Sequence, residues 1–183
     1  VFMKTYSNFL KNKQIFAPLD TSVFMNNKAR SSKSFANRNI DIAFVCSNFS
    51  RSVKNAKFAK KIFSDNRLSS KRKLVIGNNN QMFTGVPGIL KKNQMNHKDV
   101  IKHLLRTKLV ICPSYFDASP NIIKEAILCG CNILVSKNCG WSEIYPEKSV
   151  CNDVYNVRKW VMNIGYLCKN KMSYPNVSNR RKA

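Results

Sequence analysis

Apolar residues follow two alternating patterns between residues 40 and 167. Short continuous apolar runs, each the length of one buried strand, are followed by stretches in which apolar residues recur three or four positions apart, as on one face of a helix. The expected strands are 40–45, 74–76, 108–112, 132–136 and a short one near Val150, and the expected helices are 56–63, 98–106, 120–127 and 154–167. Strands that are apolar on both faces and alternate with helices are typical of parallel sheets covered on both sides. The pattern therefore predicts an α/β fold, a Rossmann-like doubly wound parallel sheet with helices on both faces.

Ser119 and Pro120 mark the expected start of the third helix. A serine hydroxyl can accept a hydrogen bond from a free N–H group of the first turn, and proline is tolerated at the first helical position because its missing N–H would have no partner there. Gly130 follows the last periodic residue and is a common residue at the end of a helix. We therefore expect Ser119 to be the N-cap and the helix to end near Gly130.

The alternation is confined to residues 40–168, which we expect to form one domain. Residues 1–39 are polar, basic and weakly periodic, and residues 169–183 form a basic tail. The longest apolar runs have the length of a strand and fall far short of the roughly 20 residues that cross a bilayer. We therefore expect a soluble domain.

The charge is strongly unbalanced, with 32 Lys and Arg against 9 Asp and Glu, a formal net charge of +23. Such a field attracts polyanions, so nucleic acid, an anionic membrane surface and a polyphosphate ligand are candidate partners. The chain also has 23 Lys and 23 Asn but only 9 Arg, which is the bias that AT-rich coding DNA produces. Codon bias with a solvated basic surface and a selected polyanionic partner both remain open.

The cysteines do not predict a metal site. There are seven, an odd number, and the one close pair, Cys129 and Cys131, is one residue short of the usual metal-binding spacing. His97 and His103 are the only histidines. Several cysteines fall in apolar strand or helix patterns, so we expect reduced, buried thiols and a cytosolic compartment.

The loops that follow the expected strands carry the candidate chemistry. In doubly wound sheets, ligands bind beyond the carboxyl ends of the strands. Those loops hold two cations, a Gly-Asn turn, a helix start and carboxylates, at Arg51, Lys54, Gly77, Asn78, Asp117 to Asn121, Glu125 and Glu143. Cations and a helix N-terminus suit a diphosphate, and one carboxylate can accept hydrogen bonds from two hydroxyls of a ribose. The chain has only three Glu, and two of them lie in this set.

Residues 113–131 resemble the signature segment of the GT4-like glycosyltransferases. The segment has Pro113-Ser114, the acidic Asp117, seven intervening residues, Glu125-Ala126 and then Cys129-Gly130. Residues 140–144 resemble the Gly-x-x-Glu-Ile loop of the family, and residues 15–24 resemble the link between its two lobes. The resemblance implies the C-terminal, donor-binding half of a GT-B glycosyltransferase, with residues 1–39 as the link and a remnant of the acceptor lobe.

The resemblance also implies roles for the candidate residues. Asp117 would lie near the donor sugar, Lys54 would neutralise the diphosphate leaving group, and Arg51, whose spacing differs from the family's, would assist it. Glu125 would hold the ribose hydroxyls. The remaining nucleotide-sugar contacts would come from Gly77, Asn78, Ala118, Ser119, Asn121 and Glu143. The implied reaction is transfer of a sugar from a UDP-, GDP- or ADP-linked donor to an unknown glycan, lipid or protein acceptor, with retention and with no cofactor or metal.

The chain departs from the family in three ways. Asp117 replaces a glutamate, the 77–80 loop has one glycine where two are common, and 183 residues are too few for both lobes. Neither His97 nor His103 lies where the acceptor lobe would supply its histidine, so no general base is assigned. Transferases of this family often act on lipid-linked acceptors, so we expect a cytoplasmic protein with a peripheral position on anionic membranes as an option.

A second hypothesis is a non-catalytic basic protein that uses the same scaffold to bind nucleic acid or a ribonucleoprotein. It rests on the net charge and on aromatic residues beside cations, as in Lys57-Phe58 and Lys159-Trp160. These aromatic residues also have the spacing of a helix core, which packing alone would explain.

Overall fold

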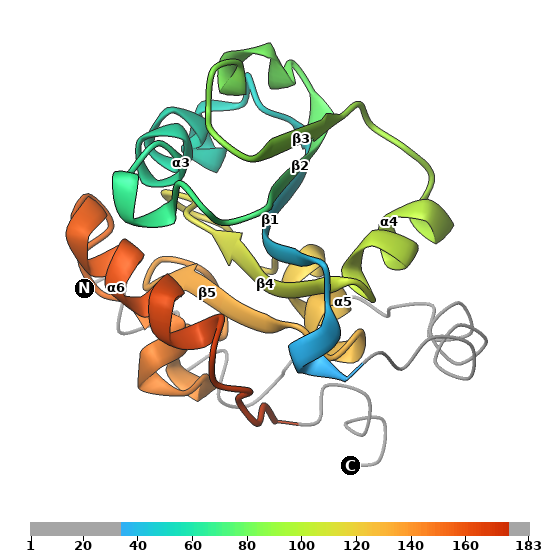
Figure 1. Ribbon diagram of the computed structural model, residues 1–183. Coiled ribbons are helices and arrows are strands. Elements are labelled where there is room, and N and C mark those ends of the chain that lie inside the picture. Colours follow the sequence, from blue (N-terminus) through green and yellow to red (C-terminus); the bar gives the residue numbers. More distant parts are fainter. Residues whose placement is uncertain (1–33, 176–183) are drawn as a thin grey trace.

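The computed structural model describes residues 34–175, which form a six-stranded, wholly parallel sheet between two layers of helices (Figure 1). The strands are β1 (Ile40–Asn48), β2 (Lys73–Asn78), β3 (Ile89–Lys92), β4 (Thr107–Cys112), β5 (Asn132–Ser136) and β6 (Val150–Cys151). The helices are α3 (Ala56–Phe63), α4 (His97–Leu104), α5 (Asn121–Leu128) and α6 (Val157–Leu167). Short 3-10 turns lie at Phe35–Asn37, Ser52–Lys54, Asn66–Leu68, Asn80–Phe83, Ser142–Ile144 and Glu147–Ser149.

The strand order is β3-β2-β1-β4-β5-β6. The chain builds outward from β1 in one direction through β2 and β3, then returns to the other side of β1 and continues through β4, β5 and β6. This is the order of doubly wound nucleotide-binding folds. The predicted α/β doubly wound sheet is therefore confirmed.

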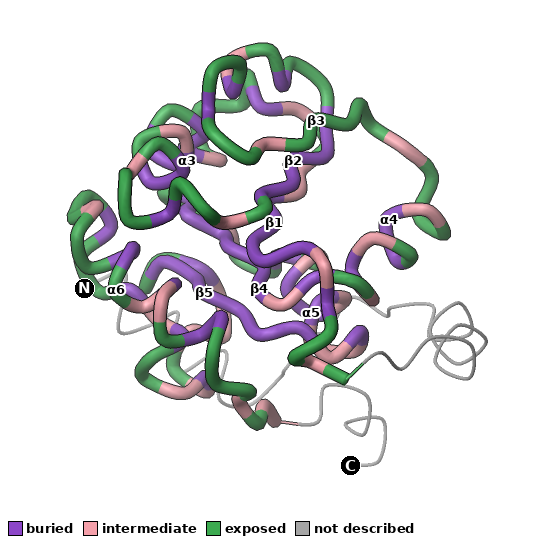
Figure 2. Tube along the Cα trace, in the orientation of Figure 1, coloured by how far each residue is buried: buried purple, intermediate pink, exposed green. Residues whose placement is uncertain are grey.

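Each face of the sheet is covered by its own pair of helices. Phe44 and Ile111 belong to a cluster with α3 and α6, whereas Ala43 and Val110 belong to a cluster with α4 and α5. Neighbouring residues of a strand point to opposite faces, so β1 contributes alternately to both clusters. Strands β2, β4 and β5 are buried along almost their whole length, and β1 is buried over its first five residues (Figure 2). The helices on both faces confirm the prediction drawn from the apolar runs.

The aromatic residues that stand beside cations in the sequence belong to the core. Phe58 on α3 and Trp160 on α6 are buried, and their rings meet edge to face with centroids 6.0 Å apart. The lysines beside them, Lys57 and Lys159, are exposed. Packing therefore explains this pattern, and these two rings are not available for stacking on nucleic-acid bases.

Strand β3 is absent from the sequence prediction. Only Ile89 and Leu90 are apolar in it, and Lys91 and Lys92 are exposed, because β3 is the edge strand of the sheet. Its pairing partner is β2, with Lys73 opposite Ile89. A strand with one neighbour and little burial carries no continuous apolar run, so the pattern does not reveal it.

The predicted N-cap was wrong. Helix α5 begins at Asn121 with Pro120 as the N-cap and no capping side chain. The Ser119 N–H instead donates to Oδ1 of Asp117 at 3.3 Å, and the Ser119 hydroxyl accepts from the Lys124 ammonium at 3.2 Å. These contacts keep Ser119 in the loop before the helix.

Residues on either side of 40–168 also pack on the domain. The Arg38 guanidinium is buried and donates to the carbonyl oxygens of Thr107 at 2.7 Å and Cys129 at 2.9 Å. On the other side, the Tyr174 hydroxyl accepts from the Ile133 N–H at 3.0 Å. The predicted family link at 15–24 lies outside the described residues.

The cysteines are free thiols, as predicted, and six of the seven are buried while Cys46 is half-buried. Within residues 34–175, no helix has the length and apolar character needed to span a bilayer.

Gly77 occupies a position that no other residue fits. Its φ is +148°, and an added Cβ would lie 2.0 Å from the carbonyl oxygen of Cys46 on the neighbouring strand. We predict that Gly77→Ala lowers the free energy of unfolding by about 2–4 kcal/mol, measured by urea denaturation.

Gly165 on α6 provides the matched control. An added Cβ there meets no atom within 4 Å, so Gly165→Ala should raise stability by about 0.5–1 kcal/mol because alanine favours the helix. Equal effects of the two substitutions would contradict the steric explanation.

Candidate functional site

A cavity of about 590 Å³ opens at the carboxyl end of the sheet. It lies where the strand order reverses, between the loops that follow β1 and β4, and its lining includes Val45 at the end of β1 and Ile76 on β2. Helices α4 and α5 supply one wall. Ligands of doubly wound folds bind at this point because the loops on either side diverge there and leave a crevice.

An ion pair joins the two loops that border the cavity. The Lys54 ammonium lies 2.5 Å from Oδ2 of Asp117, and both side chains are largely buried, with 18% and 16% of their surfaces exposed. Lys54 ends a 3-10 turn, and Asn55 follows it in a left-handed conformation, with φ of 55°. The Asn55 amide donates to the carbonyl oxygen of Pro113 at 3.1 Å. The loop after β1 is thereby fixed to the loop after β4.

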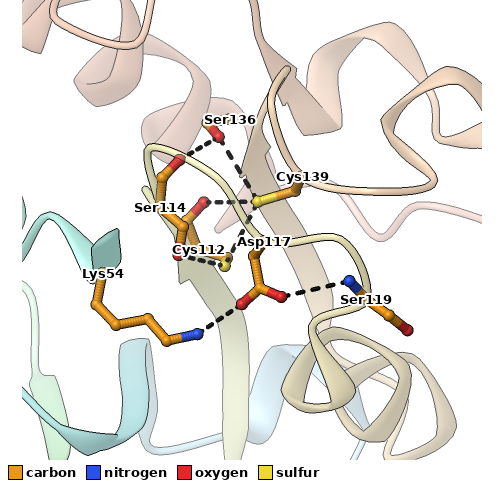
Figure 3. Close-up of polar contacts among 7 residues, drawn as sticks. All are labelled: Lys54, Cys112, Ser114, Asp117, Ser119, Ser136 and Cys139. Atoms are coloured by element: carbon orange, nitrogen blue, oxygen red, sulfur yellow. Dashed lines mark hydrogen bonds and ion pairs between the residues drawn. The ribbon is translucent and has the colours of Figure 1, made fainter. Parts of the chain in front are cut away.

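Asp117 is also held from the side of β5. The Gly140 N–H donates to the Asp117 carbonyl oxygen at 2.8 Å. The two loops are so close that a Cβ on Gly140 would lie 1.8 Å from the carbonyl oxygen of Ala118. Figure 3 shows the Asp117 carboxylate between the Lys54 ammonium and the Ser119 N–H.

Beneath Asp117, the ends of β4 and β5 share a small buried polar network (Figure 3). The Ser136 hydroxyl donates to the Ser114 carbonyl oxygen at 2.6 Å, and the thiols of Cys112 and Cys139 lie 3.7 Å apart. All four residues are buried. The network fixes the strand ends from which the Asp117 loop departs.

Glu125 and His97 form a second polar pair in the cavity. Nε2 of His97, the first residue of α4, lies 3.3 Å from Oε1 of Glu125 on α5. Only 13% of the Glu125 side chain is exposed. Burial raises the pKa of the Glu125 carboxyl, and the neighbouring His97 and Lys124 oppose that rise. A partly desolvated carboxylate of this kind suits hydroxyl groups as ligands.

Six of the ten candidate residues line the cavity: Arg51, Lys54, Asp117, Ser119, Asn121 and Glu125. Four do not. Gly77 is buried against the backbone of Cys46. The exposed Asn78 amide donates to Oε1 of Gln94 at 3.0 Å, so Asn78 contacts a lining residue without lining the cavity itself. Ala118 packs its carbonyl against Gly140, and Glu143 is exposed on the 3-10 turn Ser142–Ile144.

Sequence reasoning missed one wall of the cavity, which comprises Gln94, Met95 and His97. These residues follow β3, and their position at the ligand-binding edge becomes evident only once β3 is recognised as a strand. The available signal was the Asn93 to Asn96 stretch between two periodic segments, which is typical of a loop.

The cavity combines features that suit one kind of ligand. Lys54 and the exposed Arg51 provide cations, and the first turn of α5 presents backbone N–H groups that lack partners within the helix. The Glu125 carboxylate lies one turn further along α5. A ligand with an anionic centre and neighbouring hydroxyl groups would satisfy both parts. Among residues 34–175, no group of three or more His, Cys, Asp or Glu is arranged to hold a metal ion.

Comparison with known proteins by sequence gives no match. No protein-family model matches the chain, and no curated protein is significantly similar to it.

Comparison by structure gives many matches. WaaG, a glycosyltransferase involved in lipopolysaccharide biosynthesis, has a TM-score of 0.59 at 13% identity over 84% of this chain. The catalytic domain of cholesterol-α-glucosyltransferase from Helicobacter pylori has a TM-score of 0.56 at 15% identity over 72% of this chain. TarM has a TM-score of 0.60 at 13% identity over 77% of this chain.

These likenesses show the fold, which the described residues share with parts of these glycosyltransferase structures. The match covers 43% of WaaG and 30% of TarM, but 88% of the Helicobacter pylori domain. The chain thus spans less than half the length of two of the three structures.

The His97–Glu125 contact predicts a measurable titration. Because His97 lowers the pKa of Glu125, both through its charge and through the hydrogen bond, His97→Ala should raise the Glu125 carboxyl pKa further above its ordinary value. The carboxyl ¹³C resonance of Glu125, followed by NMR against pH, measures it. In a control, His103→Ala, the Glu125 titration should not move, since His103 does not line this cavity. An unchanged Glu125 pKa in His97→Ala would show that the pair does not form in solution.

Proposed function

We propose that this chain is the donor-binding lobe of a glycosyltransferase that transfers a sugar from a nucleotide-sugar to an acceptor. The observation that carries the proposal is the placement of Glu125 and the Lys54–Asp117 pair in one cavity at the reversal point of the sheet. The GT-B fold supports it, as does the resemblance of residues 113–131 to the GT4-like signature.

The nucleotide would lie along the wall formed by α4 and α5. The Glu125 carboxylate would accept hydrogen bonds from the two ribose hydroxyls, and its contact with His97 would orient it for this task. The diphosphate would face the first turn of α5, near Ser119 and Asn121, where the helix N-terminus attracts negative charge. Asn78, which lies outside the cavity lining, would act on the nucleotide through its hydrogen bond to Gln94, and Gly77 and Glu143 are proposed as further nucleotide contacts from the family resemblance alone.

The reacting end would lie at Lys54, Arg51 and Asp117. During transfer the bond between the anomeric carbon and the phosphate oxygen breaks, and its electron pair stays on the departing diphosphate. Lys54 and Arg51 would stabilise that developing charge. Electrostatic stabilisation of this kind is usually the largest single contribution of an active site to the rate of reaction. The acceptor hydroxyl forms the new bond to the anomeric carbon, and its proton goes to the departing diphosphate, which has gained the electron pair of the broken bond. Asp117, fixed by Lys54, would contact the donor sugar.

The finer features of the reaction follow from the family resemblance. We propose retention at the anomeric carbon and no requirement for a metal, because fixed cations would meet the diphosphate charge directly. The acceptor, a glycan, lipid or protein, would approach from the open side of the cavity. A cytoplasmic location, with contact to anionic membranes, belongs to the same proposal.

The first test is calorimetric titration of UDP, GDP and ADP. We predict that one of them binds saturably and that Glu125→Gln weakens it at least about tenfold, since both ribose hydrogen bonds lose a charged acceptor. Glu147→Gln is the control, because Glu147 is exposed and does not line the cavity. Absence of binding by all three nucleotides, together with tight binding of RNA, would favour the nucleic-acid hypothesis instead.

Lys54 should distinguish diphosphates from monophosphates. We predict that Lys54→Met removes most of the preference for the nucleoside diphosphate over the monophosphate, a change of about tenfold in the ratio of affinities. The wild-type preference should persist in EDTA. A preference that survives the substitution, or that disappears in EDTA, would remove Lys54 from this role.

A further inference from the structure

A second cavity, of about 290 Å³, lies at the opposite end of the sheet. It is lined by the first residues of three strands, Ile40 of β1, Lys73 of β2 and Ile89 of β3, and by residues that follow or end α4. Because the strands are parallel, these amino ends are separated from the donor cavity by the length of β1 and β2. The second cavity is therefore a separate site.

Four basic side chains line this cavity: Arg72, Lys73, His103 and Arg106. No Asp or Glu is among the described residues that line it. The nearest carboxylate in contact with these elements, Asp41, is engaged on both oxygens, by the Lys108 ammonium at 3.1 Å and by the Arg72 N–H at 2.9 Å. The cavity therefore has an excess of positive charge with no lining carboxylate to balance it.

Lys73 is the unusual member of the set. It is the first residue of a strand that is buried on both faces, only 1% of its surface is exposed, and its ammonium donates to the neutral carbonyl oxygen of Pro87 at 2.7 Å. Burial lowers its pKa, and the more distant Asp41 opposes this. A buried cation without a directly paired anion is costly, and a bound anion would offset that cost.

The pKa of His103 is affected by the same positive charges. Burial lowers its pKa, and the charges of Lys92 and Arg106 lower it further, while Asp99 acts in the opposite direction. The cations around the cavity thus disfavour an additional positive charge, as expected at a site suited to an anion.

From this geometry we propose that the cavity at the amino end of the sheet binds a phosphate ester. Arg72 and Arg106 each offer a planar set of donors that matches phosphate oxygens, and Lys73 in the cavity lining supplies a third charge. An apolar wall for the carbon part of the ester is provided by Ile40, Ile89 and Leu90. The Leu90 side chain is 46% exposed. The small volume favours a single phosphate with a short substituent, either free or as a lipid headgroup, over a nucleic-acid chain.

The test uses the full chain with two kinds of probe. Glycerol 3-phosphate and inorganic phosphate represent the free source, and vesicles of phosphatidylcholine with or without phosphatidic acid represent the lipid source. Binding is followed by calorimetry or co-sedimentation, and by the pKa of His103 from NMR. We expect saturable binding of one source and a rise in the His103 pKa when the phosphate charge enters.

The matched variants remove equal charge from two places. Arg72→Gln with Arg106→Gln should weaken binding at least about tenfold, whereas Lys57→Gln with Lys61→Gln, on the exposed side of α3, should change it less than about twofold. Circular dichroism confirms that both variants fold. UDP, GDP or ADP binding and its dependence on Glu125 should be unaffected by either pair, which separates this site from the donor site.

Three results would overturn the proposal. The first is that neither source of phosphate binds saturably. The second is that both double variants weaken binding equally, which would indicate diffuse surface charge. A single-stranded RNA that binds tightly, with the His103 pKa unchanged by phosphate, would assign the charge to nucleic acid instead.

Discussion

The first five residues of strand β1 are buried on both faces, and the rest of the structure follows from that constraint. Ile42, Ala43 and Phe44 are at most 1% exposed, and the strand is paired with β2 on one side and β4 on the other. A central strand that is buried on both faces needs two layers of helices, and the chain satisfies this by adding β2 and β3 in one direction and β4 to β6 in the other. The crevice between the loops after β1 and β4 results from this reversal. The candidate donor site thus occupies a position that the topology creates before any polar residue is considered.

Cross-links between loops convert that crevice into a defined site. Asn55 bonds to Pro113, Lys54 pairs with Asp117, and Gly140 holds the backbone on the other side of Asp117. Each contact joins segments that are far apart in the sequence. On the wall formed by α4, the His97 side chain contacts Glu125 of α5. The loops after β1, β4 and β5 are thus joined by both side-chain and backbone contacts, and α4 is joined to α5 by the contact between His97 and Glu125.

The sequence was sufficient for the architecture because each central strand is a continuous apolar run and each helix has a periodic apolar face. It also located Lys54, Asp117 and Glu125, since residues that follow buried parallel strands must share one edge of the sheet. It failed where burial is incomplete or where partners are distant. Strand β3 has one neighbour and two exposed lysines, so neither this strand nor the position of His97 in the cavity was predicted. Lys73 reads as an ordinary lysine before a strand, and only the packing of β3 and Pro87 shows it to be buried.

The contact between Gly140 and Ala118 also bears on how such a pocket could diversify. An atom added at Gly140 would collide with the backbone of the Asp117 loop, so the lengths and paths of the two loops are tied to each other. An insertion in either loop would need a compensating change in the other. The segment from Gln94 to His97 follows a short edge strand, and its contacts to the rest of the site, between Gln94 and Asn78 and between His97 and Glu125, are made with side chains. Substitutions in that segment could therefore change which ligand the pocket prefers without unfolding the domain. The loops around Asp117 and Gly140 do not allow such changes as readily.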